Sequence, residues 1–512
     1  MDRRVAPSVT AQQLARLLGG WTQARGKLPE RLARALRQLV QLGELVSGTR
    51  LPSERALAAA LVVSRATIVA AYELLHGAGL LESRPGSGHW VAWGESKAPS
   101  GVGAAAAFPW QHQLAPPESA LRYPPEVVDL SAIAIPASPV LVEVLSTLTV
   151  QDWTAATEEP KYLPLGLPSL RRAVADECSR RGLATSPRQI LITSGAQQGL
   201  SLTAAALVQP GDVVVVEDPL YPGQLPVLRE AGARLWTVPV DGNGVDTEAL
   251  TSIVEREKPR LVFVSPTFHN PTGSHLSVDG RARIAALAGS DLMTVVELYA
   301  SADLPLNDHP VPSPVAASGD ADSMVVIGSL SPLVWSGLRV GWIRAPEHLI
   351  ARLGQAKAIA DLGTSLLSQF VATRLLERLP ELGQLRNREL AARCSQAMDL
   401  LEELLPSFTV QRPSGGASLW VGMPAGDAGE FAHVALRHGV AVLPGQLCSA
   451  RGGHRDHVRL SFACDPTGLL VGIERLATAW TAYRKHAPDR VATRRPPINT
   501  SWWDAGRLRR RT

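Results

Sequence analysis

Two short stretches of the sequence contain groups that could hold a phosphate. In SGAQQ, which follows a predicted strand and opens a predicted helix, the backbone N–H groups of Gly195, Ala196 and Gln197 can face an anion at the helix amino end. Far along the chain, GSLSPLVWSGLRVGW supplies a hydroxyl at Ser329 and a guanidinium at Arg339. Both groups donate hydrogen bonds to phosphate oxygens, so the sequence predicts a phosphate cup built from these residues.

A second set of donors lies near the amino terminus. Ser64, Arg65 and Thr67 occupy the amino end of a predicted helix, where the helix dipole and side-chain donors can meet DNA phosphates and base edges together. Further predicted DNA contacts flank this helix: Arg50, Ser53, Arg55, Arg84, Gly86, Gly88 and His89. The alternative for any single arginine is that it only solvates a small helical domain.

Two different units must position these groups. Residues 28–93 predict three short helices, the last two capped by Ser53 and Ser64, followed by a two-stranded wing around a glycine-rich tip. Residues 127–487 alternate helical segments with strand-like runs such as DVVVVEDP and RLVFVSP. That alternation predicts an α/β fold with a mainly parallel sheet between helical layers.

The expected domain order has four segments. A DNA-binding unit over 1–93 is followed by a flexible linker rich in Gly, Ala and Pro over 94–126, the α/β domain over 127–487 and a basic disordered tail over 488–512. Residues 1–93 hold 12 Lys and Arg against 6 Asp and Glu, and residues 490–512 hold 7 against 1, within a chain of net charge +4. The two basic ends and the acidic middle predict a polyanion partner for the ends.

Composition also bounds the setting of the protein. Its 512 residues exceed the usual size of one domain, and the 4 cysteines are far apart with no CxxC pair. No apolar run approaches the roughly 18 residues needed to span a bilayer, and no apolar signal segment leads the chain. We therefore expect a cytoplasmic protein with no metal cluster and no membrane segment.

The amino-terminal motifs resemble a known DNA-binding family. LPSER, VSRATI and the closing GSGHWV fall in the same order as in the winged helix–turn–helix of the GntR superfamily, over roughly 65 residues. His89 departs from the family, which commonly has Thr there, and this changes the chemistry of a wing contact. The resemblance implies double-stranded DNA as a partner.

The large domain resembles fold-type I aminotransferases, which use pyridoxal 5'-phosphate (PLP). The matching segments, in family order over about 330 residues, are LGLPSLRRAVA, ILITSGAQQGLSLTAAAL, VEDPLYPG, SPTFHNPTG, GSLSPLVWSGLRVGW and HVRLSFA. Together with the winged helix they indicate a MocR-type regulator. The resemblance implies that Asn270 binds the cofactor ring hydroxyl, Tyr221 stacks on the ring, Tyr162 reaches in from a partner subunit of a homodimer, and Arg459 holds a substrate or effector carboxylate.

The same resemblance reveals two losses. The family has a lysine that forms a Schiff base with PLP where this chain has Pro332, and an acid against the pyridine nitrogen where the best register has Leu298. A register slipped along the chain would place the family's tyrosine at Tyr299 and the acid position at Val296. Because valine has no carboxylate, the acid is lost in either register. We therefore predict no catalytic residues at these positions.

Four interpretations follow. The first is a DNA-binding regulator whose aminotransferase-like domain mediates dimerisation and senses a small anionic effector, and the second is an active PLP-dependent aminotransferase with a DNA-binding appendage. The third is noncovalent PLP binding through the phosphate cup, and the fourth is a pocket reassigned to an unrelated anion. A relocated Schiff base would need Lys161 or Lys357.

For a dimer with two winged units, repeated half-sites are expected in the operator.

Overall fold

The computed structural model describes most of the chain. The described residues are 8–84, 88–92, 123, 126–158, 162–288, 293–306, 312–319 and 321–486, with short gaps at 19–20, 24–25, 42–44 and 46–47. The predicted linker, apart from Tyr123 and Glu126, and the predicted tail lie outside them. In the described part, no single helix has the length and apolar composition to cross a membrane. The helices Glu54–Leu61 and Arg65–Gly77 pass that test only as a pair, and this pair is bent by 118°.

The amino-terminal unit is a small helical domain with a wing. Its elements are α1 (Ala11–Leu18), η1 (Trp21–Gln23), α2 (Leu28–Gln41), α3 (Glu54–Leu61), α4 (Arg65–Gly77), β1 (Leu81–Arg84) and β2 (Gly88–Val91). Helices α3 and α4 begin at the predicted caps, because the hydroxyls of Ser53 and Ser64 accept from the backbone N–H groups of Ala56 and Thr67. The predicted helix–turn–helix and wing are thus present, whereas α1 and η1 were not predicted.

An eight-stranded sheet forms the centre of the large domain. Its strands are β4 (Ile190–Thr193), β5 (Val213–Asp218), β6 (Arg234–Asp241), β7 (Gly244–Val245), β8 (Leu261–Val264), β9 (Thr294–Leu298), β10 (Met324–Ser329) and β11 (Gly341–Arg344). The spatial order is β4-β11-β10-β9-β8-β5-β6-β7. The pairs from β10 through β9, β8 and β5 to β6 are parallel, and the pairs at both ends are antiparallel.

Helices cover both faces of this sheet, which confirms the predicted α/β class. One face buries leucines of α8 (Ala196–Leu207), α9 (Gln224–Glu230) and α12 (Glu347–Asp361) against alternate strand residues. The other face buries α10 (Thr247–Glu257) and α11 (Val278–Leu287) against the strand residues between them. Because successive side chains of a strand point to opposite faces, the valine-rich strands supply both cores.

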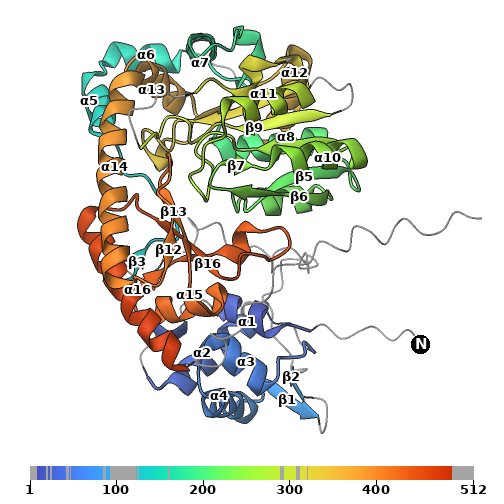
Figure 1. Ribbon diagram of the computed structural model, residues 1–512, viewed down its shortest axis with the longest axis vertical. Coiled ribbons are helices and arrows are strands. Elements are labelled where there is room, and N and C mark those ends of the chain that lie inside the picture. Colours follow the sequence, from blue (N-terminus) through green and yellow to red (C-terminus); the bar gives the residue numbers. More distant parts are fainter. Residues whose placement is uncertain are drawn as a thin grey trace, which may run out of the picture.

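A smaller carboxy-terminal subdomain lies between the large sheet and the amino-terminal unit (Figure 1). Its sheet has the order β12-β13-β16-β15. These strands are β12 (Thr409–Val410), β13 (Ser418–Gly422), β15 (Leu443–Pro444) and β16 (His457–Ser461), and β14 (Val440–Ala441) pairs with β3 (Val128–Asp129). The remaining helices are α5 (Pro139–Thr147), α6 (Val150–Thr157), α7 (Pro168–Arg180), α13 (Leu366–Leu376), α14 (Leu379–Leu404), α15 (Ala428–Arg437) and α16 (Pro466–His486).

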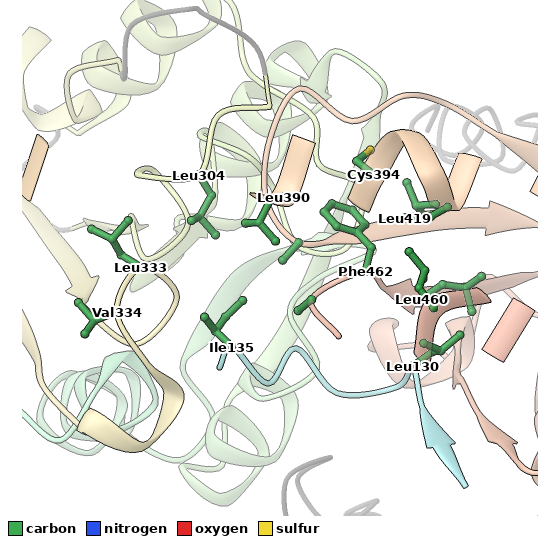
Figure 2. Close-up of a cluster of buried hydrophobic side chains, with 14 of the residues drawn as sticks. Leu130, Ile135, Leu304, Leu333, Val334, Leu390, Cys394, Leu419, Leu460 and Phe462 are labelled. Carbon is green, nitrogen blue, oxygen red and sulfur yellow. The ribbon is translucent and has the colours of Figure 1, made fainter. Parts of the chain in front are cut away.

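One hydrophobic cluster joins the two subdomains (Figure 2). It brings Leu130 and Ile135, near the start of the large domain, together with Leu390 of α14 and Phe462 after β16. Leu333, directly after Pro332, belongs to the same cluster and is 1% exposed. The turn that carries Pro332 is therefore anchored in the core.

Candidate functional site

The predicted phosphate cup lies where β4 ends and α8 begins. Gly195 has φ +99°, and a Cβ added to it would lie 2.9 Å from the Arg339 guanidinium. Arg339, itself at φ +56°, donates from Nη2 to the carbonyl of Ser194. The guanidinium therefore sits against the amino end of α8, which a side chain at position 195 would not allow.

Sheet register brings Ser329 to the same place. Gly341 of β11 pairs with Ser329 of β10 on one side and with Thr193 of β4 on the other. A Cβ at Gly341 would lie 2.7 Å from the carbonyl oxygen of Gly328 and 2.8 Å from the Cα of Gly195. Ser329 is 5% exposed, and its hydroxyl accepts from the backbone N–H of Ser331 at 3.1 Å. Residues far apart in the sequence thus lie at one surface, as the predicted phosphate cup requires.

Gln197 and Tyr221 lie together beside the cup. The amide Nε2 of Gln197 donates to the carbonyl of Gly223 at 2.9 Å, and its Oε1 is buried without a hydrogen-bond partner. A Cβ at Gly223 would lie 2.5 Å from both Gln197 Oε1 and a ring carbon of Tyr221. Ala196 is the first residue of α8. All five predicted cup residues and Tyr221 are therefore near the α8 amino end.

Asn270 and Arg459 contact each other. Arg459 on β16 is fully buried, and its Nη1 donates to Asn270 Oδ1 at 3.1 Å. Its Nη2 donates to the carbonyl of Ser131 at 2.5 Å. The guanidinium that the family resemblance assigns to a carboxylate is engaged by protein oxygens, so a ligand carboxylate would have to share or displace them.

Pro332 lies in a turn directly after β10. Its neighbours Leu333 and Val334 are buried, and their carbonyls accept from Arg386 Nε at 3.1 Å and Nη2 at 3.3 Å. The backbone N–H of Val334 donates to Leu330 at 2.9 Å. The side chain at position 332 makes none of these contacts, so the turn is shaped by its neighbours.

Leu298, at the end of β9, packs against the cluster beneath α8. The carboxylate of Glu297 points to the other face of the sheet, where its Oε2 accepts from the backbone N–H of Val315 at 2.8 Å. Burial raises the pKa of Glu297 to about 7. The hydroxyl of Tyr299 donates to the carbonyl of Pro312 at 2.6 Å within the cluster on that same face. Neither neighbour substitutes for the lost acid on the α8 side.

Lys357 of α12 is fully buried next to the cup. Its Nζ contacts both carboxylate oxygens of Asp361 at 2.9 and 2.8 Å and Gln198 Oε1 at 2.9 Å. Gln198 Oε1 also accepts from the backbone N–H of Ser194 at 2.8 Å. Desolvation lowers the pKa of Lys357, although the Asp361 carboxylate opposes that shift. This network contacts the start of α8 through Gln198, and the sequence did not predict it. Lys161, the other lysine considered, lies outside the described residues.

Tyr162 is 76% exposed. The segment that follows it packs on the turn after α12, because a Cβ at Gly363 would lie 2.7 Å from the carbonyl of Leu163. Leu362 in this turn and Leu367 of α13 are each 48% exposed. Tyr162 therefore lies beside apolar surface rather than inside the fold.

The amino end of α4 presents the predicted DNA-reading residues. The hydroxyls of Ser64 and Thr67 lie 2.8 Å apart, and Arg65 is exposed next to them. Arg65 pairs with Glu54 of α3 through Nη2 and Oε2 at 2.8 Å. This pair fixes the direction of the guanidinium and was not predicted from the sequence.

The wing residues are arranged differently from the prediction. Arg50 lies 5.7 Å from the centre of the Trp90 ring and near Gly88, and Arg55 is exposed on α3. The His89 ring instead turns toward the domain, 4.9 Å from the Tyr72 ring and 3.0 Å from His76. A network of His76, Ser83 and Glu54 thus engages the side chain expected at the minor groove. The side chain of Arg84 and the whole of Gly86 lie outside the described part of the chain.

Comparison with known proteins agrees with this geometry. The model for aminotransferase class I and II matches residues 144–476, and the model for bacterial regulatory proteins of the gntR family matches residues 28–91. The HTH-type transcriptional regulator YisV of Bacillus subtilis is 31% identical over 91% of this chain and 99% of its own. The probable rhizopine catabolism regulatory protein MocR of Rhizobium meliloti is 28% identical over 61% of this chain and 64% of its own.

The chain belongs to the aminotransferase class I and II family, carries a GntR-family DNA-binding unit, and is homologous to MocR-type regulators. It is a DNA-binding transcriptional regulator with an aminotransferase-like domain, as the sequence predicted. The crystal structure of LysN, the α-aminoadipate aminotransferase of Thermus thermophilus, is complexed with N-(5'-phosphopyridoxyl)-L-leucine. It matches at TM-score 0.64 and 28% identity over 73% of this chain and 98% of LysN. The domain thus has the fold of a PLP-binding family, and the predicted cup lies in a chain homologous to MocR-type regulators.

Proposed function

We propose that the aminotransferase-like domain of this regulator mediates dimerisation and senses a small anionic effector without a covalent link to PLP. The observation that carries this proposal is Pro332, in the turn after β10 where the family resemblance implies the Schiff-base lysine. Proline has no amine, and the neighbouring contacts that shape the turn do not require one. PLP, when bound covalently, supplies an electron sink for amino-acid chemistry.

The residues of the cup fit the phosphate of PLP, whereas the residues at the lysine and acid positions do not fit the reactive groups of the cofactor. Gly195, Ser329 and Arg339 offer a helix amino end, a hydroxyl and a guanidinium at one surface. Leu298 offers no carboxylate to a pyridine nitrogen, and Pro332 offers no amine. Noncovalent PLP or another anion of similar charge is therefore the proposed ligand, held at its phosphate by the cup.

The competing function is a PLP-dependent aminotransferase, which the structural similarity to LysN favours. It would require another lysine. The ammonium of Lys357 is held by Asp361 and Gln198 and is fully buried on α12, so it is poorly placed to attack an aldehyde. This arrangement, with Leu298 at the end of β9, argues for the regulator without catalysis.

Exposed apolar side chains support a homodimer. Val142 of α5, Val150 of α6, Leu367 of α13 and Leu362 after α12 are each between 48% and 82% exposed. The segment that follows Tyr162 packs on the turn that carries Leu362, so Tyr162 is accessible to a second copy that covers this region. A two-fold dimer would present two winged units, and an operator with repeated half-sites follows.

The deciding experiment is a titration of the full-length protein with PLP, followed by binding heat and by borohydride trapping. Saturable heat without a trapped adduct is expected, and Arg339→Ala together with Ser329→Ala should abolish the heat. A trapped adduct in the wild type would refute the noncovalent assignment. No heat at all would leave an unrelated anion as the ligand and refute PLP binding.

A restored lysine gives a matched test of the role of position 332. Pro332→Lys should produce a borohydride-trappable adduct, whereas Trp335→Lys, on an exposed side chain three residues later, should not. If neither variant is trapped while PLP still binds, position 332 does not face the aldehyde and the assignment of the lost lysine is wrong.

A further inference from the structure

A cleft separates the DNA-binding unit from the carboxy-terminal subdomain. The DNA-binding side is formed by α2, α3, the turn after α3 and the start of α4, and the other side by α15 and α16, which lie beside the blue domain in Figure 1. Its volume is about 600 Å³. The lining residues are Leu28, Ala58, Ala59, Val62, Val63, Ser64, Thr67, Glu430, Val434, Arg437, His438 and Ala482. Small-molecule sites of proteins commonly have this size and lie between domains.

The walls of the cleft are mainly apolar. Val62 and Val63 from the helix–turn–helix face Val434 of α15, and alanines of α3 and α16 complete the lining. The hydroxyls of Ser64 and Thr67 are already committed to the cap of α4. The cleft therefore offers an apolar body with few polar groups, as binding sites for small organic molecules do.

Arg437 supplies a positive charge to the cleft. Its Nη1 donates to the carbonyl of Val62 at 2.9 Å. No carboxylate of the described residues forms an ion pair with it, and burial lowers the pKa of Arg437 without an acid to oppose the shift. Burial and the Arg437 charge also lower the pKa of His438. A partly buried guanidinium without a counter-ion among the described residues is costly, and a ligand carboxylate would stabilise it through two parallel hydrogen bonds.

Glu430 limits how much negative charge a ligand can carry. It also lines the cleft, two helical turns before Arg437 on α15, and its Oε2 accepts from the hydroxyl of Tyr483 at 3.3 Å. On a helix, seven residues correspond to a rise of about 10 Å, so the two charges mark opposite ends of the cleft. A phosphate or a dicarboxylate would meet this acid, whereas a single carboxylate at Arg437 would not.

We infer that this cleft is a binding site for a small monocarboxylate with an apolar chain, separate from the phosphate cup. The carboxylate pairs with the N–H groups of Arg437 that face away from Val62, and the chain lies along Val434 and the alanines of α3. The ligand contacts both domains.

The backbone at Val62 makes this site relevant to DNA binding. Val62 ends α3 with φ 52° and ψ 53°, a left-handed conformation that β-branched residues rarely adopt. Its carbonyl is the acceptor of Arg437, so the turn between the two DNA-binding helices is held from the other domain. A carboxylate that competes for Arg437 therefore acts directly on the geometry of that turn.

The test uses sodium octanoate as a probe and calorimetry on the full-length protein. Saturable binding is expected for the wild type, with Kd at least tenfold weaker in Arg437→Gln. Ala59→Trp, which adds a ring from the exposed surface of α3 into the cleft, should abolish binding. Arg484→Gln on the exposed side of α16, away from the cleft lining, is the matched control and should bind like the wild type.

Two comparisons define the chemistry. Octan-1-ol should bind at least tenfold more weakly than octanoate, and inorganic phosphate should not compete. The double variant with Ser329→Ala and Arg339→Ala should retain octanoate binding while losing PLP, which separates this site from the cup. No saturable heat up to about 10 mM, or equal affinity in Arg437→Gln and Ala59→Trp, would overturn the inference.

Discussion

The DNA-reading end of α4 and the phosphate cup of α8 are both helix amino termini, but they are built in opposite ways. At α4 the cap, the arginine and the threonine lie within four consecutive residues and are solvent-accessible. At α8 the donors come from three separate segments, the start of α8, the end of β10 and the turn before β11, and a single atom added at Gly195 or Gly341 would collide with neighbouring atoms. A local site can change one contact at a time, whereas an assembled site depends on the packing of the whole sheet.

The largest effect is expected from Gly341→Ala. Its Cβ would lie under 3 Å from backbone atoms of Gly328 on β10 and of Gly195 at the start of α8, so this packing must shift, at a cost of about 3 kcal/mol or more. Gly383→Ala on α14 is the matched control, because nothing lies within 4 Å of its added Cβ. Urea denaturation of both variants measures the difference. Equal urea midpoints for the two variants would show that the cup tolerates a shift of its backbone. The cup would then depend on packing no more than the local site at α4 does.

The buried acid of β9 gives a pH-dependent test of the same contrast. The pKa of Glu297 is about 7 in the folded protein, against an ordinary value of 4.5, so the folded state binds more protons between these values. Stability should therefore fall as pH rises from about 4.5 to about 7 and level off above. In Glu297→Gln the urea midpoint should decrease less over this pH range than it does in the wild type. An equal decrease in both proteins would exclude Glu297 as the cause of the pH dependence.

Arg65→Ala tests the local site. If Arg65 reads a base, operator affinity should fall by about 1–3 kcal/mol with little change in affinity for random DNA. The measurement is fluorescence anisotropy at fixed salt, with Arg484→Ala as the control. A loss that is equal on operator and random DNA would make Arg65 a phosphate contact, and the Glu54 pair would then position it for the backbone.

The smallest effect is expected from Ser64→Ala. It removes the hydroxyl that accepts from Thr67 N–H and should cost about 1 kcal/mol, concentrated in the first turn of α4. Ser64→Thr keeps an acceptor oxygen and should retain most of the stability. Hydrogen exchange of the α4 amides reports the change. Equal protection in both variants would mean that packing, rather than the cap, holds this helix end.

Local patterns account for what the sequence predicted well. The caps at Ser53 and Ser64, the wing, and strands β4, β5, β8, β9 and β10 follow from spacing within a few residues. The family resemblance to both domain types was confirmed. The cup residues come together because the sheet register places Ser329 and Thr193 on either side of Gly341.

What the sequence did not reveal depends on contacts between distant segments. Lys357 behind the cup, Glu54 beside Arg65 and Arg437 beneath Val62 are charged residues at ordinary helical positions. Their partners are fixed only by how the helices pack. The inward turn of His89 has the same origin, because Tyr72 and His76 of α4 form the surface that receives its ring.

The turn at Pro332 also bears on how such a regulator could arise. Arg386 and the buried side chains of Leu333 and Val334 hold this turn without help from the side chain at position 332. The exchange of a reactive amine for a proline at this position would therefore leave a foldable protein. Selection for DNA binding would then not act on the residue at position 332. The catalytic position could change while selection maintained the fold.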